Sequence, residues 1–372
     1  MSSMKIGFVS IGNIYDRKLW SGTISFLADE LSKKYSIVPI FISNKPRRFF
    51  AKIYKIFNLT SVLRIPFLGR YILQSKISHS NCDIFFVPSG SEIIGRCRFP
   101  EDKYVIYLSD ATYHLMLDYY YYNESKKKIQ YFNNIEYLAL KRANIVIESS
   151  EWAAKDVVSY YKINSSKVFT LPFGSNLPDR YYGKKYLNHN IIRLLLIGVD
   201  WKRKGIDIAI ETVRILNEVS DSRYELTIVG FNQPNSQYED YIHFAGRLNK
   251  NLPEDVDRLV NYYLSSDIFI LPTQAECSAI VYSEAAMYGL PVFTYKTGGT
   301  ETYVDSGYNG YCLNPGSTAN DFAELITKFI NSGEYSTFSL NARKKYEMEL
   351  SWSNWFNSFN NLLSRFNINR TV

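Results

Sequence analysis

The segment IFILPTQAECSAIVYSEAAMYGLPVFTYKTGG, residues 268–299, contains two apolar runs separated by a helical pattern. The runs at 268–272 and 291–295 are short and rich in β-branched and aromatic residues, which is typical of buried strands. Between them, residues 278–288 predict a helix, and the Gly-Leu-Pro sequence at 289–291 is a strong stop signal for it. Strands that alternate with helices in this way predict an α/β fold with parallel sheets.

The same alternation continues outward in both directions. Further strands are expected at 5–11, 36–42, 83–87, 104–108 and 144–148, and then at 192–198 and 225–230. Further helices are expected at 20–33, 152–161, 205–219 and 352–366. The string LPFGSNL at 171–177 interrupts this pattern, because Pro and Gly fit poorly inside regular elements. We therefore expect two Rossmann-like domains, residues 1–177 and 178–350, followed by a C-terminal helical segment, 351–372.

The composition is that of a folded protein with two domains. A chain of 372 residues is too long for one ordinary core, and 46% hydrophobic with 21% charged residues argue against disorder. No C-x-x-C pair or metal-like cluster is formed by the cysteines, which are Cys82, Cys97, Cys277 and Cys312. The first residues lack the features of a secretory signal, and no stretch approaches the roughly 20 apolar residues of a membrane span. These features predict a reducing, cytoplasmic compartment and free thiols.

The net charge of +7 is unevenly distributed along the chain. No acidic residue lies between Glu30 and Asp83, whereas basic residues from Lys33 to Lys76 alternate with aromatic and aliphatic side chains. A segment of this kind, residues 33–76, can bind an anionic membrane surface, or it can be the solvated basic face of a helix that packs by its apolar side. Its aromatics form no recognisable RNA-binding motif, so no nucleic-acid partner is expected.

Two motifs follow expected strands of the second half, where ligands of parallel sheets bind. The first, GVDWKRKG at 198–205, has a glycine turn followed by Arg203 and Lys204 at the start of a helix. Two cations beside free backbone N–H groups suit a diphosphate, although basic turns after strands are also common without any ligand.

The second motif, ECSAIVYSE at 276–284, has two carboxylates separated by seven residues. Ser278 is expected to cap the helix, so that the first N–H groups of the helix point toward a ligand. Glu276 and Glu284 suit the hydroxyls of a sugar or a ribose, because hydroxyls donate to carboxylates. The alternative is that both are ordinary solvated glutamates of a helix. A glycine pair, Gly298 and Gly299, follows the next strand and allows close backbone approach.

The order and spacing of these motifs resemble glycosyltransferase family 4, a family of retaining enzymes of GT-B architecture. The likeness runs from Gly198 to about Leu313 and includes the R-K-G ending of the phosphate loop, the E-x7-E signature and the trailing G-G turn. The first half adds the string SGT at 21–23 and the approach to the hinge at 149–177. The resemblance implies two Rossmann-like domains that face each other across a cleft, with the C-terminal helix crossing back to the first domain.

The resemblance also implies a role for individual residues. Arg203 and Lys204 would bind the donor diphosphate, Glu284 the donor ribose, and Glu276 the donor sugar. The backbone of Ser278, Ala279 and Ile280 would contact the sugar and the phosphates, and Gly22 would approach the diphosphate from the other domain.

Three positions depart from the family's pattern. Ser21 stands where many members have a second glycine, and Ala279 also replaces a common glycine. Many members place a histidine after a strand of the first domain, where the string YLSDATYH offers Asp110, with His114 four residues later. We interpret Asp110 as the active-site residue at that position, and the alternative is that it only caps a helix.

The expected activity is the transfer of a sugar from a nucleoside-diphosphate sugar, with a UDP-sugar favoured over GDP-mannose. Retention of configuration follows from the resemblance. Independence of metal is expected because no carboxylate pair of the D-x-D form is placed to hold a metal against the diphosphate. The expected acceptor is a glycan or lipid-linked glycan of a bacterial surface polysaccharide, and the protein would work in the cytoplasm or at the inner face of the membrane. The alternative function is a catalytically silent GT-B protein that binds a sugar nucleotide or a partner.

Overall fold

The computed structural model describes residues 3–42, 67–183, 186–187, 190–234 and 237–368. It divides into two compact units, one formed by Met1–Leu171 with Phe356–Val372, and the other by Pro172–Trp355. The chain therefore enters the second unit at Pro172 and returns to the first unit at Phe356. The boundaries expected from sequence, after residues 177 and 350, lie within six residues of these two points.

Each unit is built on a parallel sheet whose strands follow the apolar runs of the sequence. The strand order in the first unit is β2-β1-β3-β4-β5-β6. Its strands are β1 (Lys5–Ser10), β2 (Ser36–Phe41), β3 (Ile84–Pro88), β4 (Tyr104–Ser109), β5 (Ile145–Glu148) and β6 (Val168–Thr170). The order in the second unit is β12-β11-β10-β7-β8-β9. Its strands are β7 (Ile191–Ile197), β8 (Arg223–Val229), β9 (Ile242–Gly246), β10 (Ile268–Leu271), β11 (Val292–Tyr295) and β12 (Gly310–Leu313).

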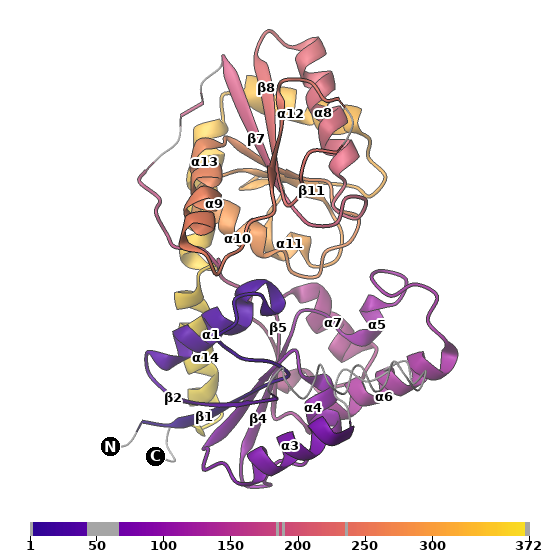
Figure 1. Ribbon diagram of the computed structural model, residues 1–372, viewed down its shortest axis with the longest axis vertical. Coiled ribbons are helices and arrows are strands. Elements are labelled where there is room, and N and C mark those ends of the chain that lie inside the picture. The colour runs from indigo at the N-terminus through magenta and orange to yellow at the C-terminus, as the bar shows by residue number, and fades with distance from the viewer. Residues whose placement is uncertain (1–2, 43–66, 184–185, 188–189, 235–236, 369–372) are drawn as a thin grey trace. The chain divides into compact units, whose positions relative to one another are not determined.

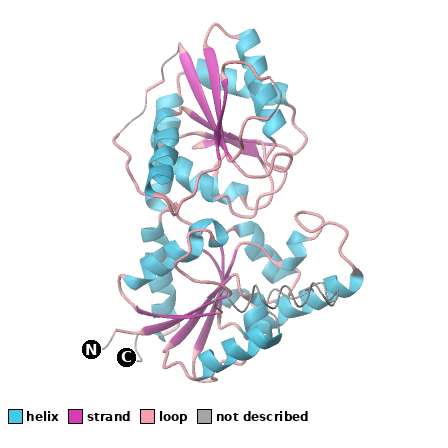
Figure 2. Cartoon of the chain, viewed as in Figure 1, coloured by secondary structure: helices cyan, strands magenta, loops and turns pink. Residues whose placement is uncertain are grey.

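Helices cover both faces of the sheet in the first unit (Figures 1 and 2). One face carries α1 (Thr23–Ser32) and α14 (Trp352–Arg365), and the other carries α3 (Phe67–Ser78), α4 (Ser91–Arg96) and α6 (Lys126–Arg142). The short helices α5 (Tyr113–Met116) and α7 (Glu151–Ser159) follow β4 and β5. The C-terminal helix α14 packs by its aromatic side, since the ring of Phe359 lies 5.7 Å from that of Phe86 on β3.

The second unit has the same layered arrangement. Helices α8 (Ile206–Val219) and α12 (Ala319–Asn331) cover one face of its sheet (Figure 1). Helices α9 (Pro253–Ser265), α10 (Ile280–Met287) and α13 (Tyr335–Met348) cover the other, and the one-turn helix α11 (Thr300–Tyr303) follows β11. None of the described helices is long and apolar enough to span a bilayer.

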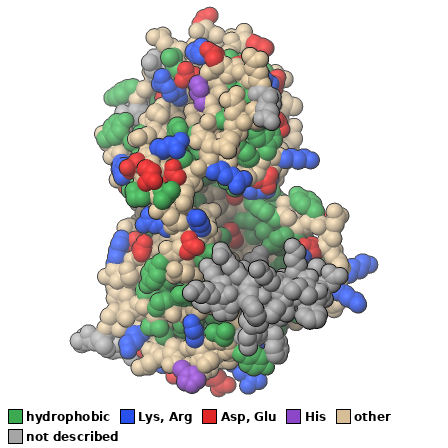
Figure 3. Space-filling view, viewed as in Figure 1, with side chains coloured by type: hydrophobic (Ala, Val, Ile, Leu, Met, Phe, Trp, Pro, Cys, Tyr) green, Lys and Arg blue, Asp and Glu red, His purple; other side chains and the backbone are tan. Residues whose placement is uncertain are grey.

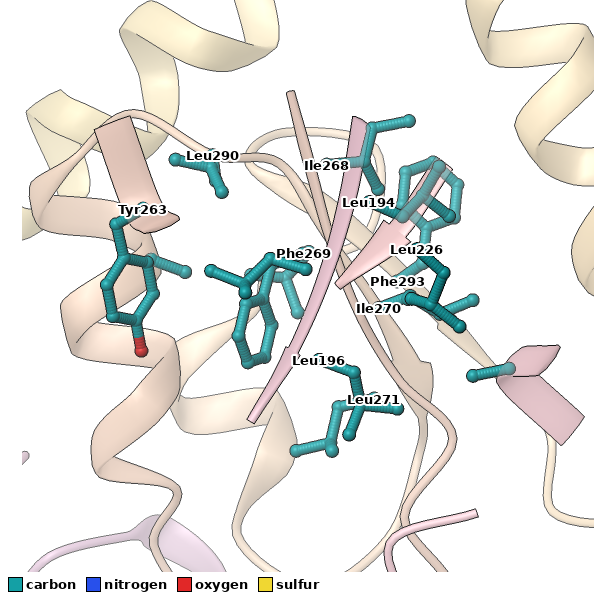
Figure 4. Close-up of a cluster of buried hydrophobic side chains, with 14 of the residues drawn as sticks. Leu194, Leu196, Leu226, Tyr263, Ile268, Phe269, Ile270, Leu271, Leu290 and Phe293 are labelled. Carbon is teal, nitrogen blue, oxygen red and sulfur yellow. The ribbon is translucent and has the colours of Figure 1, made fainter. Parts of the chain in front are cut away.

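Successive side chains of β10 point to opposite faces of its sheet, so they contribute to the core of the second unit on both sides. Phe269 points toward Tyr263 of α9, and their rings stack with centroids 6.0 Å apart (Figure 4). Ile270 points the opposite way, toward Leu226 and Phe293 (Figure 4). Because both faces of a parallel sheet are covered, its strands are apolar throughout rather than alternating, and this makes them recognisable in the sequence.

Three glycines allow the loop after β7 to pack closely against its neighbours. A Cβ on Gly205, whose φ is +67°, would lie 2.1 Å from the carbonyl oxygen of Pro272 at the end of β10. A Cβ on Gly198 would lie 2.8 Å from the Lys204 side chain, and one on Gly230 would lie 1.7 Å from the oxygen of Gly198. Only glycine tolerates such contacts, so these positions determine how closely the loops after β7, β8 and β10 approach one another.

We predict that Gly205→Ala destabilises the second unit far more than Gly307→Ala. Both glycines have a positive φ, but nothing lies within 4 Å of a Cβ on Gly307. The backbone strain common to both should cost about 1 kcal/mol, and the clash with the Pro272 carbonyl should cost Gly205→Ala at least about 2 kcal/mol more. Urea denaturation of the two variants measures the difference, and equal destabilisation would contradict the role assigned to this close approach.

Candidate functional site

Each sheet reverses its strand order at one point, and the candidate residues gather at these two points. The reversal lies between β1 and β3 in the first unit and between β7 and β10 in the second. Loops leaving the carboxyl ends of such a strand pair diverge to opposite faces, which leaves a crevice for a ligand. Each of the two sets of residues is built within its own unit.

The loop after β7 is a tight turn that presents the two cations. The backbone N–H of Lys204 donates to the carbonyl of Asp200 at 3.0 Å, and the carboxylate of Asp200 accepts from the N–H of Arg203 at 3.1 Å. The aliphatic part of Lys204 then crosses over Gly198, where a side chain would collide with it. The sequence pattern of this loop therefore directs Lys204 toward β10.

The loop after β10 is hydrogen-bonded to this turn. The carbonyl of Arg203 accepts from the N–H of Gln274 at 2.7 Å and from the hydroxyl of Thr273 at 3.2 Å. In return, the guanidinium of Arg203 donates to the carbonyl of Ala275 at 3.0 Å. These bonds hold the two loops in one register, and Glu276 is placed directly beside the basic turn.

Lys204 and Glu276 form an ion pair that is largely withdrawn from solvent. The ammonium of Lys204 donates to Oε2 of Glu276, and the two side chains are only 11% and 9% exposed. The Arg203 guanidinium lies 3.8 Å from the same oxygen. Thus the structure brings together three of the residues singled out from the sequence, and two cations share one carboxylate.

The loop after β11 completes the arrangement around Glu276. The N–H of Gly299 donates to the backbone carbonyl of Glu276 at 3.0 Å, and the hydroxyl of Thr297 donates to the carbonyl of Gln274 at 3.3 Å. Three adjacent strands, β7, β10 and β11, therefore contribute loops to one site. The glycine pair that follows β11 lies at this junction.

Helix α10 begins slightly later than the sequence predicts. Its first residue is Ile280 and its N-cap is Ala279, which provides no side-chain hydrogen bond. The expectation that Ser278 caps this helix is therefore wrong, since Ser278 precedes the cap position. No side chain at the cap position occupies the N–H groups of the first turn, so they remain suited to an anionic ligand.

Glu284 lies on α10 and is completely buried. One of its oxygens accepts from the ammonium of Lys250 at 2.5 Å, and the other accepts from the hydroxyl of Tyr263 at 2.9 Å. Burial, followed by the charge of Glu284, raises the pKa of Tyr263 well above its usual range, so the phenol keeps its proton and donates. The interpretation of Glu284 as a solvated helix residue is wrong. Sequence analysis did not identify Lys250, which lies in the loop before α9 and matches no local pattern.

We predict that Lys250→Met strongly destabilises the second unit, by about 3 to 5 kcal/mol, because it leaves a buried carboxylate without its cation. The matched control is Lys296→Met, which breaks a pair with Glu301 whose two side chains are 55% and 54% exposed and which should change stability little. The double variant Lys250→Met with Glu284→Gln should regain most of the loss. Urea denaturation measures all three, and a loss no larger than that of the control would contradict the prediction.

In the first unit, Gly22 follows two residues with unusual backbone conformations. Trp20 and Ser21 have φ values of +48° and +57°, in the left-handed region that favours glycine, and Gly22 has a φ of +93°. Consequently, helix α1 begins at Thr23 rather than at residue 20, and Gly22 is its N-cap. The strained turn places the indole N–H of Trp20 on the carboxylate of Asp110 at 3.1 Å.

Asp110 lines a cavity of about 410 Å³ at the reversal point of the first sheet. The cavity is bordered by residues that directly follow β1 and β3, namely Ile11 and Ser89, and by residues of α6. The alternative role of Asp110 as a helix cap is wrong, because the cap of α5 is Thr112. His114 is held elsewhere, with Nδ1 2.9 Å from Asp156 and its ring stacked 3.6 Å from that of Tyr160.

A buried carboxyl group, Glu148, lies at the end of β5 in the same unit. In the part of the chain that the structure describes, neither of its carboxyl oxygens has a hydrogen-bond partner. Burial raises the pKa of Glu148 well above its usual value, and the charges of Glu136, Asp110 and Asp156 raise it further. The group is therefore expected to be protonated and neutral at neutral pH.

We predict that Glu148→Gln becomes more stable relative to the unsubstituted protein as the pH rises. The pKa of the folded state lies above the value of 4.5 that applies to the unfolded chain, so folding binds a proton. Above that value, the free energy of unfolding should fall by up to about 1.4 kcal/mol per pH unit, until the pKa of the folded state is reached. Glutamine cannot ionise, so Glu148→Gln lacks this contribution to the dependence of the free energy of unfolding on pH.

Urea denaturation between about pH 5 and 8 measures the difference between the two proteins. The exposed Glu101→Gln serves as the control and should show a nearly constant difference. A constant difference for Glu148→Gln as well would mean that Glu148 is ionised in the folded protein.

The basic interval of residues 33–76 is only partly described, because residues 43–66 lie outside the described residues. Among its described cations, Lys33 pairs with Glu30 at 2.6 Å, and Lys76 donates to the carbonyl of Phe41 at 2.8 Å. On the face shown in Figure 3, basic and acidic side chains are interspersed. In the described part of the chain, no three His, Cys, Asp or Glu side chains lie together in an arrangement that could hold a metal ion.

Comparison with known proteins supports a glycosyltransferase. Residues 183–345 match the family model of Glycosyl transferases group 1, which covers the candidate residues of the second unit. The lipopolysaccharide glucosyltransferase WaaG of Escherichia coli is 26% identical over 186 residues, or 46% of this chain and 49% of WaaG. The amylovoran biosynthesis glycosyltransferase AmsK of Erwinia amylovora is 27% identical over 178 residues, or 43% of this chain and 42% of AmsK. The matches span about half the length of the curated relatives.

Solved structures match nearly the whole chain. Sucrose-phosphate synthase from Thermosynechococcus elongatus has a TM-score of 0.70 at 14% identity, over 98% of this chain and 99% of that one. Alr3699/HepE of Anabaena, solved in complex with UDP and glucose, has a TM-score of 0.67 at 15% identity, over 97% and 100%. These similarities show that the fold is GT-B, with two Rossmann-like domains, as the sequence resemblance implies.

Proposed function

We propose that this chain transfers a sugar from a nucleoside-diphosphate sugar to a glycan of a bacterial surface polysaccharide, and that the donor binds to the second unit. The observation that carries the proposal is the pairing of Lys204 with Glu276, beside Arg203, at the reversal point of that sheet. Two cations next to the start of α10 match the charge of a diphosphate. The matches to WaaG and AmsK, both named for polysaccharide synthesis, support the pathway class.

The two cations are assigned to the leaving group. As the bond between sugar and phosphate breaks, negative charge grows on the nucleoside diphosphate, and Lys204 and Arg203 are already positioned to stabilise it. The N–H groups at the start of α10, around Ala279 and Ile280, add a partial positive charge. This set supports chemistry without a metal, since the protein supplies the positive charge itself.

The two carboxylates are assigned to hydroxyl groups. Glu276, in the loop beside the cations, is assigned to the donor sugar, and Glu284, deeper on α10, to the ribose. A carboxylate has about four acceptor sites, so Glu284 retains acceptor capacity beyond its bonds to Lys250 and Tyr263. Its complete burial means that Lys250 must shift when a ribose approaches.

Retention of configuration and a UDP-sugar as donor complete the proposal. The retaining mechanism rests on the resemblance to family 4, and UDP is supported by the complex of Alr3699/HepE with UDP and glucose. Asp110 is assigned to the reacting sugar from the first unit, and Gly22 to the diphosphate. Attachment to an anionic membrane surface through residues 33–76 is part of the same proposal.

Calorimetric titration with UDP and with GDP, in the presence of a metal chelator, tests this assignment. We expect UDP to bind, and both Lys204→Ala and Glu284→Ala to weaken binding by about tenfold to a hundredfold, as expected for the loss of charge-assisted hydrogen bonds. The control is Lys328→Ala, which removes an exposed cation of the same unit and should leave binding unchanged.

Three outcomes would contradict parts of the proposal. Unchanged binding in both variants would exclude the donor site assigned to the second unit. Binding that appears only when magnesium replaces the chelator would exclude the metal-independent mechanism. Binding of GDP in preference to UDP would reverse the assignment of the base.

A further inference from the structure

A second cavity of the first unit is rich in arginine. It has a volume of about 450 Å³ and is lined by residues of α3, α4 and α6, the helices that cover one face of the sheet, and by residues directly after α4. Its arginines are Arg70, Arg96, Arg98 and Arg142, and none of the described residues that line it is acidic. It shares no described lining residue with the cavity beside Asp110, so it is a separate feature of the molecule.

The packing of the three helices holds these arginines close together. A Cβ on Gly95 would lie 2.9 Å from the carbonyl oxygen of Ile135, so the glycine lets α4 approach the backbone of α6 closely. The side-chain amide of Gln74, on α3, accepts from the N–H of Arg98 at 2.7 Å and donates to the carbonyl of Arg98 at 2.9 Å. The segment 95–98, which carries two of the arginines, is therefore fixed to both neighbouring helices.

Arg142 offsets the partial negative charge at the end of α4. Its Nη1 donates to the carbonyl of Ile94 at 3.1 Å and to that of Gly95 at 2.7 Å. Carbonyls at the C-terminus of a helix repel anions, and a cation bonded to them opposes that effect. The Nε and Nη2 atoms of Arg142 make no hydrogen bond to the described residues, so their N–H groups can donate to a ligand.

The other three arginines differ in how their side chains are engaged. Arg96 forms an ion pair with Glu92 at 2.7 Å. The side chains of Arg70 and Arg98 form no hydrogen bond or ion pair within the described part of the chain. Burial raises the pKa of the Cys97 thiol, whereas the charges of Arg70 and Arg96 lower it, so their positive potential acts on a group in the cavity wall. Arg70 and Arg98 thus contribute positive charge that no described carboxylate balances.

Several guanidinium groups in one cavity favour one kind of ligand. A guanidinium is planar, always charged and able to donate two parallel hydrogen bonds, which matches the oxygen atoms of a phosphate. A carboxylate has only two oxygens, whereas a phosphate or diphosphate has oxygens that point in several directions and can accept from several guanidiniums at once. The volume is also sufficient, since pockets for small ligands start at about 300 Å³.

We propose that this cavity binds a phosphate or diphosphate group, and that it is separate from the donor site assigned to the second unit. The proposal does not depend on the proposed function, because it rests on the arginines of the first unit alone. Two sources offer such a group, namely a phosphorylated compound in solution and the headgroup of an anionic lipid. Both present the same oxygens to the guanidiniums, so the test includes a probe for each source.

Calorimetric titration of the intact chain with inorganic pyrophosphate is the first arm of the test. We expect pyrophosphate to bind, and Arg70→Ala and Arg98→Ala each to weaken binding by about tenfold, as expected for the loss of a charge-assisted hydrogen bond. Arg98→Lys keeps the charge but loses the planar fork, so it should also weaken binding. The control is Lys141→Ala, which removes an exposed cation of α6 that does not line the cavity and should leave binding unchanged.

Cosedimentation with vesicles is the second arm, and it compares phosphatidylcholine alone with phosphatidylcholine that contains phosphatidic acid. Retention on the acidic vesicles that falls in Arg98→Ala but not in Lys141→Ala would identify a lipid headgroup as the source. Retention that is the same in both variants, together with pyrophosphate binding that requires Arg98, would identify a soluble phosphorylated ligand. Urea denaturation of each variant checks that it remains folded, as expected because the side chains of Arg70 and Arg98 form no bond to the described residues.

Three results would overturn the proposal. The first is that neither pyrophosphate nor acidic vesicles distinguish Arg70→Ala and Arg98→Ala from the unsubstituted protein. The second is pyrophosphate binding that is lost only in Lys204→Ala, which would place the ligand in the second unit. The third is full binding of pyrophosphate by Arg98→Lys, because charge alone, without the fork of the guanidinium, would then account for the attraction.

Discussion

Lys204 and Glu276 form a nearly buried ion pair on which the organisation of the second unit's site depends. A charge is costly to remove from water unless its partner lies close by, so the loops after β7 and β10 must approach each other closely enough for the pair to form. That approach is possible because Gly205 leaves room for the carbonyl of Pro272, and because Gly198 leaves room for the stem of Lys204. The hydrogen bond from the N–H of Gln274 to the carbonyl of Arg203 then holds the two loops in register. The two glycines therefore make possible the ion pair between Lys204 and Glu276, which lie 72 positions apart in the sequence.

In the part of the first unit that the structure describes, the buried carboxyl group of Glu148 is not stabilised by an ion pair as Glu276 is in the second unit. Among the described residues, neither oxygen of Glu148 has a hydrogen-bond partner, and burial, followed by the charges of Glu136, Asp110 and Asp156, favours its neutral form. The raised pKa of Glu148 favours its protonated form, which avoids placing a further negative charge in the buried end of β5. Backbone strain also occurs in the loop after β1, where Trp20 and Ser21 adopt positive φ values. Strained residues persist where the surroundings hold them in place, and here the bond from Trp20 to Asp110 is one of the contacts that do so.

Much of this arrangement can be predicted from the sequence, and the exceptions have physical reasons. Long apolar runs such as those at β1 and β7 identify buried strands. Strand β9, with sequence IHFAG, has no such run, because His243 interrupts its apolar residues. Arg203, Lys204 and Glu276 could be predicted to meet, since each follows a strand of one parallel sheet. Lys250 could not, because its partner Glu284 is reached only through the packing of α9 and α10. The sequence places the start of α10 too early, because Ser278 fits the cap pattern, whereas the chain becomes helical only after Ala279.

The pairing of each carboxylate with its own lysine explains how two glutamates can lie beside a diphosphate site. Glu276 is neutralised by Lys204 and Glu284 by Lys250, so neither adds an unbalanced negative charge. Under the proposed function, a diphosphate would compete with Glu276 for Lys204, and this would free acceptor capacity on Glu276 at the moment when the sugar hydroxyls arrive. The negative charge of the diphosphate would thus replace that of Glu276 beside the ammonium of Lys204, with little change in the net charge around that ammonium. Such an exchange needs a flexible ammonium on a fixed stem, and the packing of Lys204 against Gly198 provides that geometry.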